Sequence, residues 1–446
     1  MPYDAIVIGG GLSGLSAAVD LAASGSRILL LEGKPHLGGR TYSFVDRESG
    51  DVVDNGQHLL MGCYHKTRRY LNLIGSQQKA RLQKTLHIEF LHPRNGRAAL
   101  RCPPLPAPFH ILAGLAGLST VSLAHRLRLL RVGLDLRFRS EEGVEALRSL
   151  TVDEWLTSLG QTPENKKYLW DIIAIGSLND DPKDVSAWLF FRVLKAAFLG
   201  SRQDSCLLVP QVGLSELLVD PAREFLERQG GVVRLNARAE KIVSDGTTLG
   251  VTDEEGREES AACGVLALPY HAWPDVQGIS ELSGIPGTQL AKFQSSPIVT
   301  INLWLDRIVL NREFVALLNS DVHWVFNKSA LVGSQSRGQY LSLVISGARD
   351  YVDLEREVLE ALALEELRRF LPAARDAKVV SSLVIKEKRA TFSPRPGIDA
   401  SRPGTETATR NCFLAGDWTD TGFPATIEGS VLSGFRAAAA CRKVLK

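Results

Sequence analysis

Apolar and polar positions at the start of the chain follow a pattern that predicts a strand, a helix and a second strand. Residues 5–8 form a short continuous apolar run, which is typical of a strand buried on both faces. Residues 15–24 are rich in alanine and leucine and predict a helix, and residues 27–31 predict a strand that ends at Glu32. A strand–helix–strand order of this kind favours parallel pairing of the two strands.

Similar patterns recur far along the chain. The later elements predicted in this way are an amphipathic helix over 214–229, a buried strand over 264–270, a short strand over 412–415 and a helix over 429–440. Buried strands and helices that are so widely separated in sequence predict an α/β domain assembled from several pieces of chain.

The turn between the first strand and the first helix carries glycines at the spacing G-x-G-x-x-G. In such a turn the first glycine makes the tight bend, the second lets the backbone approach a pyrophosphate, and the third lets helix and strand pack closely. The helix N-terminus adds N–H donors, and a carboxylate at Glu32 can accept a hydrogen bond from a ribose hydroxyl. The predicted phosphate-binding residues are Gly9, Gly10, Gly11, Leu12, Ser13 and Gly14. A purely structural glycine turn is the alternative, and the motif alone does not separate NAD from FAD.

Two further segments favour FAD. Gly38-Gly39-Arg40 is a second glycine turn with a fixed cation, past which a longer cofactor must thread its pyrophosphate and ribityl chain; Gly33 and Lys34 begin this segment. Near the C-terminus, Gly416-Asp417 closes a strand with a carboxylate that can bind a ribityl or ribose hydroxyl. The helix N-terminus at Ile427-Glu428-Gly429 can direct backbone N–H groups at the N1/O2 edge of a flavin ring.

Composition narrows the class of protein. A chain of 446 residues is longer than a single hydrophobic core usually supports. Its content of 44% hydrophobic and 23% charged residues is typical of a globular protein. A net charge of +2 argues against nucleic-acid binding. The six cysteines are scattered without metal-ligand spacing, which fits a reducing cytoplasm and predicts no metal. The N-terminal pattern is not that of a signal peptide, and no apolar stretch reaches the roughly 20 residues of a membrane span.

These cofactor segments together resemble the flavoprotein superfamily of amine oxidases and carotenoid-type desaturases. The resemblance implies a Rossmann-type FAD-binding domain, discontinuous in sequence, and a substrate domain of mixed sheet and helices, so the chain is α/β in class and α+β overall. The implied FAD-binding pieces are 1–75, 205–270 and 380–446, and the implied substrate pieces are 76–204 and 271–379. In this superfamily a residue matched here by Ala239 presents its backbone to the adenine.

A narrower resemblance covers nearly the whole chain. Residues 51–75, 103–110 and 198–217 are similar to the hydroxysqualene dehydroxylase family of bacterial hopanoid and squalene biosynthesis. That similarity implies reductive removal of the hydroxyl group of hydroxysqualene with a hydride from reduced FAD. It also implies a hydrophobic C30 isoprenoid substrate and companion squalene-pathway synthases as partners.

This chemistry requires an apolar tunnel for the substrate, an exposed flavin N5 and a proton donor. By pattern, Asn55, Gly56, Gln57 and His58 fall where superfamily members bring the chain against the flavin. His58 is then a candidate general acid, because its ordinary pKa lies near 6.5, and Gln57 is a candidate for orienting the leaving oxygen. A histidine that only bonds the backbone or a flavin carbonyl is the alternative for His58.

Rival functions share this architecture. Oxidative desaturation of a polyprenoid moves hydride in the opposite direction, and the residues alone do not assign the direction. Amine oxidases commonly carry an aromatic residue where this chain has Thr426, and that residue forms one wall of an aromatic cage around the amine. This chain lacks that aromatic wall. No cysteine lies between 417 and 428, so FAD is expected to be noncovalent. A non-catalytic lipid carrier that retains FAD is the third alternative.

Residues 90–134 combine apolar stretches with arginines and contain no acidic residue. The six arginines are Arg94, Arg97, Arg101, Arg126, Arg128 and Arg131. The region 105–140 is therefore predicted to form monotopic membrane-contact helices, with arginines at anionic head groups. A helical pair packed into the substrate domain with a solvated basic face is the alternative. The expected location is the cytoplasm, peripheral to the inner face of the cytoplasmic membrane.

Overall fold

The apolar runs at both ends of the chain form strands of one sheet in the computed structural model, which describes residues 3–92, 96–335 and 338–446. The spatial order is β10-β2-β1-β13-β12-β11, and β19 pairs with the second half of β13. Strands β10, β2, β1, β13 and β19 are parallel, whereas β11 and β12 are antiparallel. The strands are β1 (Tyr3–Ile8), β2 (Ile28–Leu31), β10 (Val232–Arg234), β11 (Ala239–Ser244), β12 (Leu249–Asp253), β13 (Glu258–Leu266) and β19 (Cys412–Leu414).

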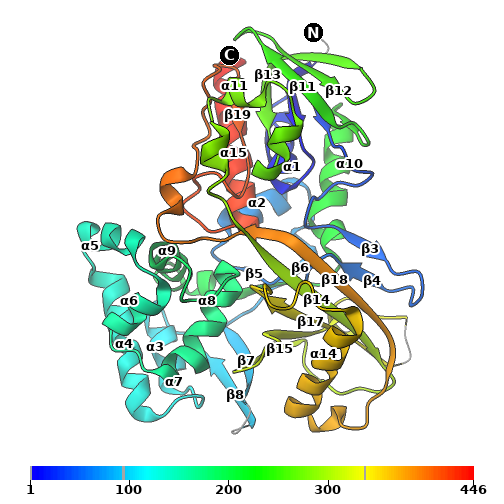
Figure 1. Cartoon of the computed structure of the whole chain (residues 1–446). Helices are drawn as coiled ribbons and strands as arrows, with labels where there is room; N and C mark the ends of the chain where they lie inside the picture. The colour runs from blue at the N-terminus through cyan, green and yellow to red at the C-terminus, as the bar shows by residue number, and fades with distance from the viewer. Residues whose placement is uncertain (1–2, 93–95, 336–337) are drawn as a thin grey trace.

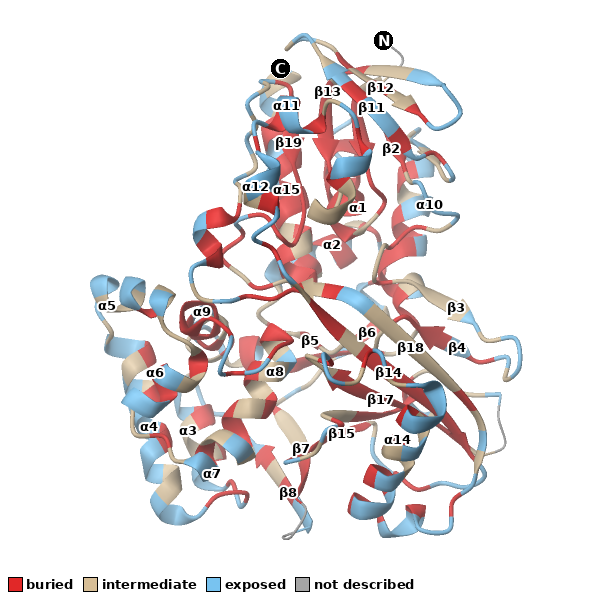
Figure 2. Cartoon of the chain, viewed as in Figure 1, coloured by how far each residue is buried: buried red, intermediate tan, exposed pale blue. Residues whose placement is uncertain are grey.

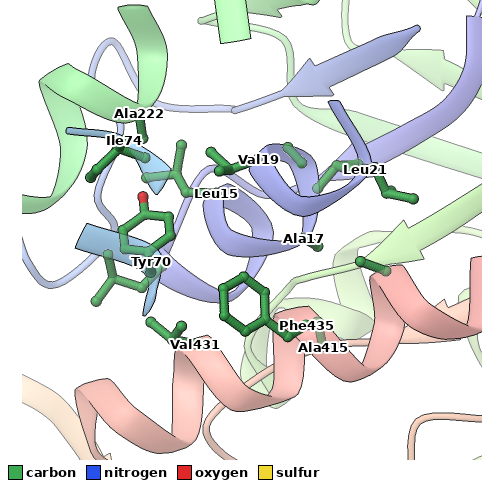
Figure 3. Packing of buried hydrophobic residues seen from close by; sticks show 14 of the residues in the cluster. Leu15, Ala17, Val19, Leu21, Tyr70, Ile74, Ala222, Ala415, Val431 and Phe435 are labelled. Carbon is green, nitrogen blue, oxygen red and sulfur yellow. The ribbon is translucent and has the colours of Figure 1, made fainter. Parts of the chain in front are cut away.

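Helices cover this sheet and join the two ends of the chain (Figure 1). These are α1 (Leu12–Ala22), α2 (His65–Leu73), α10 (Asp220–Arg228) and α15 (Ile427–Val444). Figure 3 shows how Leu15 and Val19 of α1 pack with Tyr70 of α2 and with Val431 and Phe435 of α15. All five side chains are buried, so the first and last helices share one hydrophobic core. The sheet and its helices form a Rossmann-type domain built from distant pieces of chain.

A second sheet lies beyond the Rossmann-type domain (Figure 1). Its order is β18-β14-β17-β16-β15-β7-β8, and only β15 and β7 pair in parallel. The strands are β7 (His87–His92), β8 (Gly96–Arg101), β14 (Ser295–Leu305), β15 (Phe314–Leu317), β16 (Trp324–Asn327), β17 (Gln339–Ser346) and β18 (Val379–Phe392). Helix α14 (Arg356–Phe370) packs on this sheet through Leu359, Ala363 and Leu367. The boundary expected at residue 380 falls inside β18, which pairs with β14 of this second sheet.

A lobe of helices stands beside the second sheet and shares a hydrophobic core with it (Figure 1). The lobe consists of α3 (Phe109–Ala116), α4 (Leu123–Phe138), α5 (Glu141–Ala146), α6 (Val152–Ser158), α7 (Pro163–Asn165), α8 (Asp171–Leu178) and α9 (Ala187–Phe198). Among the described residues, no helix combines the length and apolar character needed to cross a bilayer. The mixed sheet together with the helical lobe agrees with the expected second domain.

Smaller elements complete the fold. They are the pair β3 (Ser43–Val45) and β4 (Val52–Asp54), the three-stranded sheet β5 (Leu60–Met61), β9 (Leu207–Pro210) and β6 (Ala80–Leu82), and the short helices α11 (Ile279–Ser283), α12 (Gly287–Leu290) and α13 (Lys328–Leu331). Helices α11 and α12 contribute Ile279, Leu282 and Leu290 to the hydrophobic core of the first sheet.

The helix predicted over 214–229 is interrupted. A π-helical turn over Ser215–Val219 precedes α10. Pro221 has no N–H for the bond that would run back to Leu217, so the chain passes through a wider turn before the regular helix begins.

Candidate active site

The glycine turn after β1 is shaped by two contacts that exclude side chains. Gly9 has φ +106°, and its N–H donates to the Leu31 carbonyl at 2.8 Å. A Cβ on Gly14 would lie 1.9 Å from the Gly9 carbonyl oxygen, so only glycine fits there. Helix α1 starts at Leu12, directly after Gly11, with no acidic residue in its first turn and no side chain capping its N-terminus. The first N–H groups of α1 are therefore available to an anion.

The second glycine turn packs directly on the first. Gly38 donates its N–H to the Gly10 carbonyl at 2.8 Å, and Gly11 and Gly38 form an isolated parallel bridge. A Cβ on Gly39 would lie 3.3 Å from the Gly11 Cα. Two turns separated by a helix and a strand in sequence thus form one backbone surface next to the N-terminus of α1.

Glu32 is held by backbone N–H groups at the end of β2. Its Oε2 accepts from Gly10 at 2.7 Å and its Oε1 accepts from Lys34 at 2.8 Å. Each carboxylate oxygen has a second lone pair, which a ribose hydroxyl can use. The Ala237 N–H donates to the Glu32 carbonyl at 2.9 Å, so the chain leading to Ala239 lies beside the predicted ribose site.

Arg40 connects three of the predicted segments. Its Nη2 donates to Asp417 Oδ2 at 2.7 Å, and its Nη1 donates to the Ala390 carbonyl at 2.6 Å. Asn55 Nδ2 donates to the Arg40 carbonyl at 3.2 Å. The fixed cation of the second turn, the carboxylate after β19 and the segment preceding His58 are therefore neighbours.

The N-terminus of α15 is organised by Thr426 and Glu428. Thr426 Oγ1 accepts from the Gly429 N–H at 3.1 Å, so this threonine caps the helix. The Glu428 side chain turns away and accepts from the N–H groups of Lys66 and Thr67, both at 2.9 Å, at the start of α2. Glu428 can therefore bind a cofactor at this helix terminus only through its backbone N–H, which lies next to the backbone N–H of Ile427.

Arg402 is a residue of this site that the sequence pattern did not reveal. Its side chain is completely buried, and it donates to the carbonyls of Asp417 at 3.1 Å and Phe423 at 2.7 Å. It thus ties together the loop between β19 and α15. An arginine in a polar loop normally indicates a solvated surface, so no sequence signal pointed to this role.

The segment after β4 carries Gln57 and His58. His58 Nδ1 lies 2.7 Å from the Gly56 carbonyl, which only accepts hydrogen bonds, so Nδ1 carries the proton and Nε2 remains open. Burial lowers the pKa of His58 below its ordinary value, although the Gly56 carbonyl and the Asp54 carboxylate oppose that shift. Gln57 Oε1 accepts from the Lys328 ammonium at 2.8 Å, a second contact that the sequence did not indicate.

The site fits the pyrophosphate of a dinucleotide. A Cβ placed on Gly11 would meet no atom within 4 Å, so space is open in front of the uncapped N-terminus of α1. Glu32 accepts from the Gly10 N–H of this turn, and Arg40, which is paired with Asp417, follows the Gly39 that lies against Gly11. These charged groups can serve the phosphates and the hydroxyls of the ribose and ribityl groups. A second helix N-terminus, that of α15, follows Asp417 along the chain. When bound, FAD supplies hydride chemistry to such a site.

A Rossmann-type domain with two glycine turns and an acidic residue after its second strand, joined to a second domain of mixed sheet and helices, is the arrangement of an FAD-dependent oxidoreductase. The chain belongs to the family described as flavin containing amine oxidoreductase, whose model matches residues 12–442.

Relatives within this family act on different substrates, as their names state. The chain is 29% identical over 433 residues to a hydroxysqualene dehydroxylase from Rhodopseudomonas palustris, covering 97% of this chain and 96% of that protein. It is 26% identical over 465 residues to a 15-cis-phytoene desaturase from an Oncidium hybrid cultivar, covering 97% of this chain and 76% of the desaturase. The solved structure of a putrescine oxidase bound to putrescine has a TM-score of 0.73 at 15% identity, over 98% of both chains. That structural likeness agrees with the fold.

Proposed function

We propose that this chain converts hydroxysqualene to squalene by reductive dehydroxylation. The C–O bond breaks and the hydroxyl leaves as water after accepting a proton, while the carbon accepts a hydride as reduced FAD is oxidised to FAD. The observation that carries the proposal is the match to a hydroxysqualene dehydroxylase along nearly the full length of both chains. A phytoene desaturase matches at lower identity and is longer than this chain.

The surroundings of His58 support a water-poor site for a hydrocarbon. Leu59 and Met61, one and three positions after it, are half-buried and pack against the core shared by the helical lobe and the second sheet. Trp324 and Phe326 of β16 belong to the same core and stack with ring centroids 6.2 Å apart. An apolar chain bound against this cluster would place its reacting end next to the polar pair Gln57 and His58.

In this proposal His58 protonates the leaving oxygen through Nε2, because its Nδ1 is committed to the Gly56 carbonyl. Gln57 orients that oxygen through its amide. Thr426, at the position where amine oxidases carry an aromatic residue, caps α15, so it offers an amine no aromatic wall.

Single turnover under anaerobic conditions tests this function. Purified protein with photoreduced FAD is mixed with hydroxysqualene, and flavin absorbance and extracted squalene are followed together. We expect one squalene per flavin oxidised, with release of FAD from denatured protein in unmodified form. Absence of both signals would eliminate the proposal.

Oxidative desaturation is the second candidate, and the match to a phytoene desaturase favours it. The discriminating arm uses oxidised enzyme with squalene or a carotenoid precursor. Bleaching of the flavin with formation of a new double bond would support the desaturase and remove the dehydroxylase. A flavin that neither bleaches nor recovers with any terpenoid would support a lipid carrier.

We further propose that the helical lobe docks on the inner face of the cytoplasmic membrane. Helix α4 carries an exposed apolar stripe at spacings of three and four residues, which places it on one helix face. The exposed stripe consists of Leu123, Leu127, Leu130, Leu134 and Phe138, and exposed Leu105 and Phe109 lie on or just before α3. The opposite side of α4 is buried through Leu129, Val132 and Leu136. Figure 2 shows the exposed positions along the lobe.

Arginines flank this stripe. Arg128, Arg131 and Arg137 are exposed, whereas Arg126 is half-buried and donates to the carbonyls of Val121 and Ala116. Arg94 lies outside the described residues. An apolar stripe bordered by arginines suits insertion at the head-group level of anionic lipid. The same surface is where a nearly insoluble C30 substrate, delivered by companion squalene-pathway synthases, would enter.

The double substitution Leu127→Asp/Leu134→Asp is expected to lower vesicle binding by about tenfold or more for each leucine, since burying a leucine contributes about 1.5–3 kcal/mol. Co-sedimentation with phosphatidylglycerol/phosphatidylcholine vesicles measures it, and Ile308→Asp, on an exposed residue outside the lobe, is the matched control. Equal binding of wild type and double variant would contradict docking through this stripe.

A further inference from the structure

Lys328 is a buried cation in contact with the candidate catalytic segment. It begins α13, directly after β16 of the second sheet, and only 1% of its side chain is exposed. Its Nζ lies 2.6 Å from Asp54 Oδ2 and 2.8 Å from Gln57 Oε1. A lysine is rarely buried to this extent unless it is paired, and here it meets two acceptors that both belong to the chain near the predicted flavin.

Asp54 is anchored on its other side to the Rossmann-type domain. Its Oδ1 accepts from Ser43 Oγ at 2.6 Å and from the Leu214 N–H at 2.8 Å. The carboxylate is 3% exposed, so the Asp54–Lys328 pair is fully desolvated and fixed in place. The pair therefore holds the lysine of the second domain at a defined position against Gln57.

This position determines the orientation of the Gln57 amide. An ammonium group only donates hydrogen bonds, so Gln57 must direct Oε1 at Lys328 and its Nε2 elsewhere. The contact of Nε2 with the His58 carbonyl is long, at 3.5 Å, which leaves N–H donors available to a ligand. A hydroxyl that departs as water gains electron density on oxygen, and that oxygen is stabilised by donors and destabilised by acceptors.

We propose that Lys328 is a positioning residue that makes Gln57 a hydrogen-bond donor to the substrate hydroxyl. The inference rests on the dehydroxylase function proposed above. It also explains substrate choice: a desaturase substrate that reacts at C–H bonds has no oxygen for these donors, whereas an alcohol does. Lys328 acts only through Gln57 and touches no reacting atom.

A double-mutant cycle tests this coupling. Removing Lys328 alone would leave the Asp54 charge buried and unpaired, so both charges are removed together in Asp54→Asn/Lys328→Met. This variant, Gln57→Ala and their combination are compared with wild type in single turnover with hydroxysqualene. We expect each to oxidise reduced FAD at least about tenfold more slowly. The combination should be no slower than Gln57→Ala, because both changes remove the same donor.

Further readouts separate positioning from damage to the fold. In the charge-free pair, FAD affinity and reoxidation of the reduced flavin by dioxygen should remain within about twofold of wild type, because Lys328 acts only through the Gln57 amide. The ratio of hydroxysqualene to squalene affinity should fall in all three variants. The inference would be overturned if the rate losses of Gln57→Ala and of Asp54→Asn/Lys328→Met multiplied in the combined variant. Loss of FAD from Asp54→Asn/Lys328→Met, the charge-free pair, would overturn it as well. If the wild-type protein does not turn over hydroxysqualene, both the proposed function and this inference are refuted. If the wild type is active and the charge-free pair is equally active, only the inference is refuted.

Discussion

Replacing Gly11 by valine is expected to abolish FAD uptake while the apoprotein keeps its fold. Gly11 has extended backbone angles (φ −73°, ψ 177°), which any residue can adopt, and a Cβ there would meet no atom within 4 Å. The added side chain would start in this open space, through which the pyrophosphate is expected to reach the N-terminus of α1. We expect FAD affinity to fall by at least about 100-fold, which is about 2.7 kcal/mol.

Flavin fluorescence titration and thermal unfolding of the apoprotein measure the two parts of this prediction. Gly287→Ala, which also adds a Cβ in open space but in α12, is the control and should bind FAD normally. Gly14→Ala should lose both binding and stability, since its Cβ would collide with the Gly9 carbonyl. Normal FAD affinity in the Gly11 variant would mean that the cofactor does not cross this turn.

Replacing His58 by alanine is expected to leave FAD binding intact and to slow dehydroxylation at least tenfold, since a positioned general acid typically contributes roughly 10²–10⁴-fold. The imidazole has one nitrogen committed to the Gly56 carbonyl, so only Nε2 can serve the substrate. Stopped-flow oxidation of reduced FAD by hydroxysqualene measures the effect. His65→Ala, on an exposed histidine paired with Asp204, is the matched control. An unchanged rate in the His58 variant would rule out this role.

The pH dependence of the same reaction follows from the direction of the His58 shift. Burial lowers the pKa of His58, so near neutral pH the ring is mostly neutral and Nε2 carries no proton. Donation requires the imidazolium, whose fraction grows about tenfold per pH unit as pH falls toward that pKa. The single-turnover rate should therefore rise from pH 8 to pH 6.5 and level off only below 6.5. His58→Ala should remove this slope, and a wild-type rate that is flat over this range would contradict proton transfer from His58.

The local elements of the Rossmann-type domain were predictable because their signals lie within short windows of sequence. The apolar run before Gly9 became β1, the run before Glu32 became β2, and the segment after Asp417 became α15. The interruption at Pro221 was foreseeable in principle from its missing N–H, whereas the pairing of β18 with β14 was not. Most positions of strand β18 are half-buried, without a regular alternation of buried and exposed residues, and such a pattern does not tell which distant strand is its partner.

The candidate site divides in a similar way. Spacing along the sequence makes the glycine turns, Glu32 and Arg40 predictable, because a phosphate requires a close approach of the backbone and a nearby cation. The partners Arg402 and Lys328 carry no such mark, since a buried basic residue and a solvated one look alike in sequence. Glu428 was expected at the cofactor, and its backbone lies at the N-terminus of α15, but its side chain caps α2.

By itself the sequence determined that an anion-binding turn between a strand and a helix exists, and that distant segments suit the same cofactor. These features depend on hydrophobic periodicity and on the small size of glycine, which act within a few residues. Only the tertiary structure decided that the charge of Lys328 reaches Gln57 and that Arg40 meets Asp417. Such contacts join residues hundreds of positions apart, and a buried ion pair forms only where the folded chain excludes water and brings opposite charges together.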